Sequence, residues 1–327
     1  MTRILVLSAL AALVASISVR AYQLPPAPTP STEQPAPLDG QPVFRARTNL
    51  VTLQVNVFDG RSDAVSELPQ DAFRVYEDGV EQHIDFFADR EVPVAVGLVV
   101  DNSSSMIARH DMVVAGVTAF AESSHEADQM FTVVFNEHVR FGLPPALPFT
   151  NDRDLLLSAL AQRRPGGLTA LHDAVIDGLS HLAEATHTKR VLVVLSDGKD
   201  NASSLSESNM LYRAAQSSAL IYTIWTGDVA QDRGNPRLLR NLAQRTGGVA
   251  YAPHNERETV DAFRHVAANI RRGYSIGYVP TNAANDGSFR RVKVMLNVPG
   301  RKLSVRVRDG YIAPDDGVVE AEREPHQ

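Results

Sequence analysis

The sequence predicts an α/β fold: a doubly wound, mostly parallel sheet inserted between two halves of a smaller β-sandwich-like domain. Between residues 92 and 272, apolar strand-like runs alternate with helix-like segments, which is typical of a parallel sheet with helices on both faces. On either side of this region, apolar residues recur at every second position, as in strands that bury one face. Each flank alone has too few strands for a stable sheet, so we expect one joint domain. Two small independent sheets are the alternative.

The first 42 residues predict export followed by a tether. Arg3 precedes an apolar or small-residue stretch at 4–19, and Val19-Arg-Ala21 has small residues at the spacing that a signal peptidase recognises. We therefore predict a signal peptide at 1–21 and an exported protein that is periplasmic, on the cell surface or secreted. The stretch is shorter than the roughly 20 residues of a membrane-spanning helix, so no span is expected after cleavage, and an uncleaved anchor is the alternative. The proline-rich segment 22–42 is typical of a semi-extended tether.

The first half of the β domain is assigned to residues 43–91. Apolar and polar side chains alternate from Val51 to Val57, which predicts a strand with one buried face. A hairpin follows, because alternating segments at 73–75 and 82–86 flank Asp78-Gly79, a dipeptide favoured in tight turns.

The α/β region, 92–272, should contain five strands and six helices. The expected strands are Val94–Asp101, Met130–Phe135, Arg190–Ser196, Leu220–Trp225 and Gly248–Ala252. The expected helices are Ala108–Ser123, Asp152–Gln162, Ala170–Ala185, Ser206–Ser218, Pro236–Arg245 and Glu256–Arg271. Ser204-Leu-Ser-Glu207 predicts a capping box, and Gly247-Gly248 predicts a helix end.

The second half of the β domain is assigned to 273–313, and a disordered tail to 314–327. Alternating strands are expected at 274–278, 292–298 and 303–307, with turns at 285–287 and 299–300.

Five oxygen-bearing side chains follow predicted strands or begin a predicted helix. Asp101, Ser103 and Ser105 come directly after the apolar run that ends at Val100, Thr169 lies in a Gly-Gly-Leu-Thr loop, and Asp197 follows another strand. Ligand sites of parallel sheets lie at the carboxyl ends of the strands, where such loops converge. Two carboxylates and three hydroxyls suit a hard divalent cation such as Mg²⁺.

The order Asp-x-Ser-x-Ser, a distant Thr and a distant Asp-Gly resembles the metal-ion-dependent adhesion site (MIDAS) of von Willebrand factor type A (VWA) domains, and all five positions match. Residues 92–272 are similar in size and element order to a whole VWA domain. The flanking segments 71–79, 289–292 and 308–311 resemble those of an exported bacterial VWA subfamily.

This resemblance implies that Asp101, Ser103, Ser105, Thr169 and Asp197 hold Mg²⁺, with Mn²⁺ or Ca²⁺ as alternatives. It also implies that Asp101 and Asp197 act partly through water, so that the cation keeps an open position. A protein or peptide partner would occupy that position with a Glu or Asp carboxylate. The expected function is therefore partner binding without catalysis.

Two other functions stay open. Mg²⁺-dependent phosphatases also place Asp at the end of a first parallel strand, but they need a second Asp two residues later, where this chain has Ser103. The sequence contains no Gly-x-Ser-x-Gly motif for a serine esterase. The other alternative is a structural module whose metal site binds no partner.

Each of the five residues also has an ordinary structural interpretation as a helix cap or turn residue. Asp173 is expected to support the site or its helix and not to bind metal, and Asp200, Asn201 and Ser203 are expected to be loop residues. The histidines are scattered, without the close pairing of a zinc motif.

Composition excludes several classes. The formal net charge of −6 argues against a nucleic-acid partner, which favours a clustered basic face. The chain has no cysteine, so disulfides, thiolate metal sites and cysteine lipidation are excluded. Its 327 residues suggest more than one domain.

Overall fold

The α/β domain is organised by a central strand that is buried on both faces. In the computed structural model, which describes residues 50–315 apart from 61–62, 90–91, 162–163 and 228–233, β6 (Val94–Asp101) is buried along its whole length. It pairs in parallel with β7 (Gln129–Phe135) on one side and β9 (Lys189–Ser196) on the other. The sheet order is β11-β10-β9-β6-β7-β8, in which β10 (Leu220–Trp225) and β11 (Ala250–Tyr251) are also parallel, whereas β8 (Val139–Phe141) is antiparallel. The predicted, mostly parallel sheet is confirmed.

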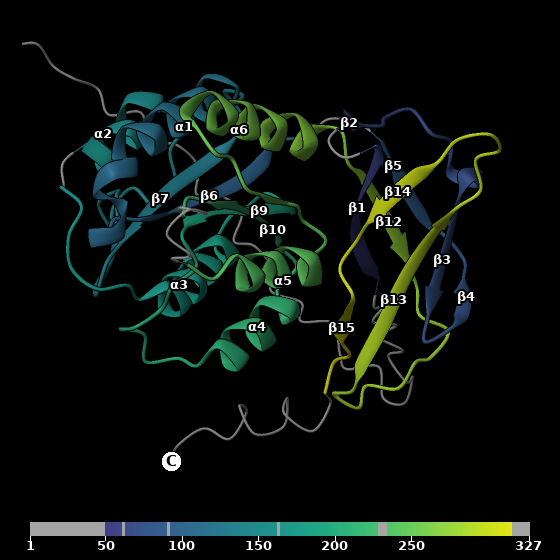
Figure 1. Ribbon diagram of the computed structural model, residues 1–327. Helices are drawn as coiled ribbons and strands as arrows, with labels where there is room; N and C mark the ends of the chain where they lie inside the picture. Colours follow the sequence, from purple (N-terminus) through teal and green to yellow (C-terminus); the bar gives the residue numbers. More distant parts are fainter. Residues whose placement is uncertain (1–49, 61–62, 90–91, 162–163, 228–233, 316–327) are drawn as a thin grey trace, which may run out of the picture. The chain divides into compact units, whose positions relative to one another are not determined.

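Helices cover both faces of this sheet (Figure 1). One face packs against α1 (His110–Glu122), α2 (Arg153–Ala161) and α6 (Glu256–Arg271), and the other against α3 (Leu171–Ala183), α4 (Glu207–Gln216) and α5 (Pro236–Thr246). The strands serve both layers because neighbouring side chains point to opposite faces. In β6, Leu98 belongs to the first core and Val99 to the second.

The β domain combines strands from both ends of the described chain. β1 (Val51–Asp59) pairs antiparallel with β12 (Tyr274–Tyr278), with Leu53 opposite Ile276. One sheet has the order β14-β1-β12-β5, with β2 (Asp63–Ala64) beside β1, β5 at Phe86–Ala88 and β14 at Leu303–Arg306. The other has the order β15-β13-β3-β4, formed by Gly310–Ile312, Phe289–Leu296, Phe73–Glu77 and Val80–Gln82. These pairings confirm that the two flanks form shared sheets. The residue boundaries between the domains stay predictions.

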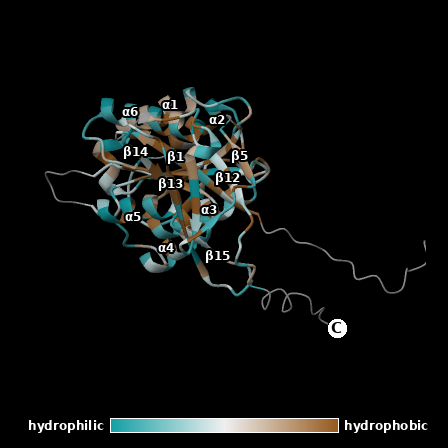
Figure 2. Cartoon of the chain, turned by 90° about the vertical axis from the view of Figure 1, so that its right-hand side faces the viewer, coloured by the Kyte–Doolittle hydropathy of each residue, from teal (hydrophilic) through white to brown (hydrophobic). Residues whose placement is uncertain are grey.

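The two sheets of the β domain enclose one apolar core. Figure 2 shows the hydrophobic colour gathered on the strands and the hydrophilic colour on turns and helix ends. Glu77 lies at the border of this core and accepts hydrogen bonds from the hydroxyls of Tyr278, at 2.7 Å, and Tyr311, at 2.8 Å. Since Tyr278 belongs to one sheet and Glu77 and Tyr311 to the other, this group ties the two sheets together.

Several local predictions need correction. The alternating segment 82–86 is not one strand: β4 ends at Gln82 in one sheet and β5 begins at Phe86 in the other. The predicted turn at 285–287 lies between β12 and β13, whose membership of different sheets the alternation did not indicate. The predicted capping box is wrong, because Ser206 is the N-cap of α4 and accepts from the Asn209 N–H. A 3-10 helix, η2 (Ser104–Arg109), precedes α1, which therefore begins later than predicted.

Other local predictions are confirmed. Asp78 and Gly79 both have positive φ, 47° and 87°, as a type I′ hairpin turn requires. α5 ends at Gly247.

The predicted signal peptide at 1–21 and tether at 22–42 lie outside the described residues, as does the tail from residue 316. Pro314 and Asp315 still belong to the described structure, where Gly287 N donates to Pro314 O. None of the helices in the described ranges has the length and apolarity that crossing a membrane requires.

Candidate functional site

Asp101 joins the ends of the two central strands. It is the last residue of β6 and is 2% exposed. Its Oδ1 accepts a hydrogen bond from Ser103 N at 2.9 Å, and its Oδ2 accepts one from the Ser196 hydroxyl at 2.6 Å. Ser196 ends β9, so this second bond spans the junction between β6 and β9. The carboxylate is therefore held in place at the carboxyl edge of the sheet.

The two predicted serine ligands lie side by side. The Ser103 and Ser105 hydroxyls form a hydrogen bond in which either can be the donor, with their oxygens 3.1 Å apart. Ser103 is buried, whereas Ser105 is exposed on the first turn of η2. The loop thus presents two neutral oxygens next to Asp101, one of them accessible from solvent.

Asp197 follows β9 and is buried. Its backbone carbonyl accepts hydrogen bonds from Asn235 N, at 2.8 Å, and from Trp225 Nε1, at 3.1 Å. Its Oδ1 accepts from Lys199 N at 3.0 Å, and its Oδ2 lies 3.9 Å from the Lys199 ammonium. The strand end is therefore fixed by its backbone, and the carboxylate has one cation nearby.

Thr169 is placed by loop contacts with both neighbouring strand ends. Its backbone N–H donates to Asn201 Oδ1 at 2.8 Å, and its carbonyl accepts from Asn201 N at 2.9 Å. Two further bonds, Ser104 N to Gly167 O and Gly166 N to Asn102 O, join the loop before Thr169 to the loop after Asp101. The Thr169 hydroxyl makes no hydrogen bond within the described part of the chain, which leaves its oxygen available to a ligand.

Burial and a nearby negative charge both raise the pKa of Asp101. Loss of hydration raises its pKa to about 6, and the nearby negative charge of Asp197 adds to the rise. Hydrogen bonds from Ser103 and Ser196 act in the opposite direction. Two carboxylates thus lie close together, with an electrostatic cost that a bound cation would relieve.

Residues that we predicted to be supporting or loop residues hold the 197–205 loop on the start of α3. Asp200 Oδ2 accepts from His172 N at 3.0 Å and from the Ser203 hydroxyl at 2.5 Å. Asp173 accepts from the backbone N–H groups of Ser204 and Leu205. The carboxylates of Asp173 and Asp200 therefore anchor this loop, and the proposed metal site does not require them as ligands.

Sequence reasoning missed the residues that hold the site loops in register. Ser196 supports Asp101, Asn102 donates through Nδ2 to Arg164 O at 3.3 Å, and Asn136 donates through Nδ2 to Gly166 O at 3.1 Å. All three lie at or just after strand ends, next to or facing predicted ligands. That position was the only available signal, because a single Ser or Asn in a loop is compatible with many roles.

The donor set fits a small divalent cation. Two adjacent ligands of octahedral Mg²⁺ are about 3.0 Å apart when each lies about 2.1 Å from the ion, and the serine hydroxyls show nearly this separation. Among the described residues, no three His, Cys, Asp or Glu side chains form a metal-ligand group. A cation held here would therefore depend on hydroxyl oxygens besides the two carboxylates.

A pocket of about 230 Å³ adjoins the Asp101 loop and is lined by Asn102, Val134, Phe135, Asn136, Arg140 and Arg164.

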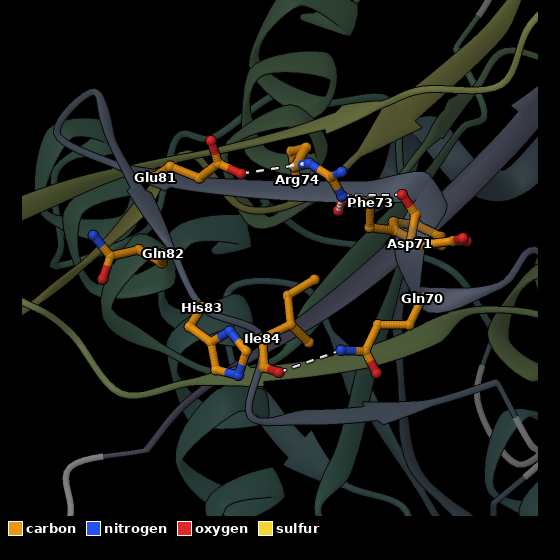
Figure 3. Close-up of a pocket in the computed structure, with 8 residues that line it drawn as sticks. All are labelled: Gln70, Asp71, Phe73, Arg74, Glu81, Gln82, His83 and Ile84. Carbon is orange, nitrogen blue, oxygen red and sulfur yellow. Dashed lines mark hydrogen bonds and ion pairs between the residues drawn. The ribbon is translucent and has the colours of Figure 1, made fainter.

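A second pocket, of about 520 Å³, lies in the β domain (Figure 3). The arginine in its lining is already engaged, because Arg74 pairs with Glu81 at 3.4 Å and donates to the carbonyls of Asp71 and Phe73. None of the five predicted ligands lines this second pocket, so it is separate from the candidate site.

The α/β domain is doubly wound. It carries acidic and hydroxyl side chains at the carboxyl edge of its central strands. Residues 96–199 match the family described as von Willebrand factor type A domain. The chain therefore contains a VWA domain. A comparison with curated proteins found no match.

Several solved structures are similar to this chain at low identity. A von Willebrand factor type A protein from Catenulispora acidiphila is 13% identical, with a TM-score of 0.49, over 84% of this chain and 77% of that one. An aerotolerance-related membrane protein from Bacteroides fragilis is 17% identical, with a TM-score of 0.45, over 54% of this chain and 98% of that one. The vWF domain of the type V pili tip protein Mfa5 from Porphyromonas gingivalis is 16% identical, with a TM-score of 0.45, over 55% of this chain and 95% of that one. These identities are too low to transfer a function.

Proposed function

We propose that this protein binds an acidic protein or peptide partner through a divalent cation at a MIDAS. Asp101, Ser103, Ser105, Thr169 and Asp197 are the proposed ligands, and Mg²⁺ is the preferred ion. The observation that carries the proposal is the 3.1 Å separation of the Ser103 and Ser105 hydroxyls beside the buried Asp101 carboxylate. It matches the spacing of neighbouring octahedral ligands.

The predicted ligands and Ser196 would have different roles at the site. Asp101 and Asp197 supply negative charge, and Ser196 keeps the Asp101 carboxylate oriented. Two carboxylates formally balance the charge of a divalent ion, and the three hydroxyls add oxygens without adding charge, so a vacant position on the ion would stay electrophilic. When bound, the cation would supply an electrophilic position for a partner carboxylate. The exposure of Ser105 supports access to the site from solvent.

Isothermal titration of the full chain with Mg²⁺ and Mn²⁺ tests the ligand set. Ser105→Ala and Thr169→Ala should each weaken cation binding about tenfold or more, because each removes an oxygen ligand. Ser104→Ala is the matched control: this serine lies between the two predicted ligands and is exposed, its backbone N–H donates to Gly167 O, and its hydroxyl forms no hydrogen bond among the described residues. Equal affinities for all three variants and the wild type would contradict the ligand assignment.

A second measurement separates binding from turnover and from a purely structural role. With the peptide acetyl-Gly-Glu-Gly-amide as probe, we expect binding in Mg²⁺ that is lost in chelator and in Asp101→Ala. Phosphatase turnover that disappears in Asp101→Ala would favour the hydrolase instead. A metal-dependent melting temperature without any peptide binding would favour the structural module.

We also propose that the protein is exported. The support is the sequence at 1–21, where Arg3 precedes a short apolar stretch and small residues at a cleavage spacing. Expression of the full chain in a bacterial host, followed by fractionation and amino-terminal sequencing, tests this. An uncleaved protein confined to the cytoplasm would contradict it.

A further inference from the structure

We propose that the pocket next to the Asp101 loop is a second carboxylate subsite, so that the preferred partner is a peptide segment with two acidic side chains. This inference rests on the proposed function, because the first acidic side chain would occupy the metal site. The second would be bound by Arg140 and Arg164.

The pocket is continuous with the predicted metal loop. Asn102, which lines it, lies in the chain between Asp101 and Ser103 and is itself buried. Its backbone carbonyl accepts from Gly166 N at 2.8 Å, and its side chain donates to Arg164 O at 3.3 Å. The segment carrying Arg164 is therefore fixed to the same loop that carries the predicted ligands.

The other arginine, Arg140, is contacted by Asn136. Arg140 follows β7 in the antiparallel edge strand β8, and its Nη1 lies 3.5 Å from Asn136 Oδ1. Asn136 also donates to Gly166 O, two residues after Arg164. One amide side chain therefore contacts the Arg140 guanidinium, and another fixes the backbone of Arg164.

The charge of the pocket is unbalanced. Two arginines line it and no acidic residue does. Neither arginine has an ion-pair partner within 4 Å among the described residues. Glu137 interacts electrostatically with Arg140, but its Oε2 accepts from Leu168 N at 3.0 Å. The guanidinium groups are therefore available to an incoming anion.

A carboxylate fits this pocket in chemistry and size. The planar guanidinium fork matches carboxylate oxygens in pairs, and about 230 Å³ admits an Asp or Glu side chain. An acidic residue near the metal-binding one would place both carboxylates on a single peptide, and the second contact would add to the first without a separate loss of translational freedom.

Calorimetric titration of the full chain with two kinds of synthetic peptide tests the proposal. One kind carries a single Glu among glycines, and the other carries two Glu residues separated by increasing numbers of glycines. In Mg²⁺, the best two-Glu peptide should bind about fivefold tighter than the one-Glu peptide, and the difference should shrink with added salt.

The variant R140Q/R164Q should bind the one-Glu peptide as the wild type does and should lose the advantage of the two-Glu peptide. R213Q/R240Q is the matched control, because it removes the same charge from exposed positions on α4 and α5. It should keep the advantage. The variant R140K/R164K, which keeps the charge without the planar fork, should show an intermediate advantage.

The outcomes separate the two proposals. If neither peptide binds in a Mg²⁺-dependent way, the proposed function itself is wrong, and the second subsite with it. If Mg²⁺-dependent binding persists but both peptides bind wild type equally, only the second subsite is overturned. Equal weakening of both peptides by R140Q/R164Q, or the same loss in R213Q/R240Q, would also overturn it. Inorganic phosphate that occupies the pocket without any two-Glu advantage would assign the pocket to phosphate instead.

Discussion

Ser196 donates a hydrogen bond of 2.6 Å from its hydroxyl to Asp101 Oδ2, and both residues end a central strand of the α/β sheet. The Ser196 hydroxyl also accepts from Gly198 N at 3.0 Å. One buried serine thus connects both strand ends that carry the predicted acidic ligands. Its position determines how the Asp101 carboxylate is oriented before any ligand arrives.

Replacing this serine should damage both stability and the site. In Ser196→Ala, Asp101 Oδ2 and Gly198 N each lose a partner, so we expect unfolding free energy to fall by about 1–3 kcal/mol. Mg²⁺ affinity should fall as well, because the carboxylate is no longer held in one orientation. Urea unfolding and calorimetry measure the two effects. Ser180→Ala removes an exposed hydroxyl that bonds only within α3, and should change stability by less than about 0.5 kcal/mol. Equal stability of both variants would contradict the role of Ser196.

Asp101 should make stability depend on pH when metal is absent. Its pKa rises from 3.8 to about 6 on folding, so the folded state holds a proton that the unfolded state releases. The associated stability is fully present below pH 3.8 and is lost as pH rises through about 6, a total of about 3 kcal/mol. In chelator, Asp101→Asn should therefore gain stability relative to wild type between about pH 4 and pH 7.

Urea unfolding at several pH values measures this difference, and taking wild type minus variant cancels the other titrating groups. Added Mg²⁺ should restore wild-type stability near neutral pH and leave the variant almost unchanged. A difference that stays constant across this pH range would contradict the raised pKa.

Lys199 should compete with the cation. Its ammonium lies 3.9 Å from Asp197 Oδ2 and its side chain is 41% exposed. Lys199→Gln removes that charge, so Mg²⁺ should bind about two- to fivefold tighter, with the largest gain at low salt. Arg213→Gln removes a charge from an exposed position on α4 and controls for net charge. Calorimetry that shows weaker Mg²⁺ binding in Lys199→Gln would assign Lys199 a supporting role instead.

The sequence predicted the features that leave a pattern in consecutive residues better than those that depend on the three-dimensional arrangement. The strands of the α/β sheet were found because they are buried on both faces, and the five-residue motif was found because its order is distinctive. β8 was missed because it is three residues long and partly exposed. The segment 82–86 misled because the alternation continues where the chain passes from one sheet to the other, and Phe86 in it is exposed. Ser196 was missed because its partner, Asp101, is distant in sequence.

Gly198 should resist substitution for two separate reasons. Its φ is +81°, and an added Cβ would lie 2.4 Å from the carbonyl oxygen of Asn235. Gly300 has a similar φ of +78° but open space around the Cβ position. Gly300→Ala should therefore cost about 1–2 kcal/mol from backbone strain alone, and Gly198→Ala clearly more, with reduced Mg²⁺ affinity because Asp197 shifts. Urea unfolding of both variants makes the comparison. Equal costs would mean that the 197–198 backbone moves away from Asn235 without resistance.

A buried hydrogen bond between the β domain and the α/β domain should couple their stabilities. Asn56 Nδ2 on β1 donates to the Tyr222 hydroxyl on β10 at 3.1 Å, and both side chains are buried. Tyr222→Phe and Asn56→Leu each leave one polar group without its partner, so each should lower unfolding free energy by about 1–3 kcal/mol. The double variant should cost at least about 0.5 kcal/mol less than the sum, because the unpaired group is then absent. Urea unfolding of all four proteins completes the cycle, and strictly additive costs would show that this bond contributes nothing to the attachment of the two domains.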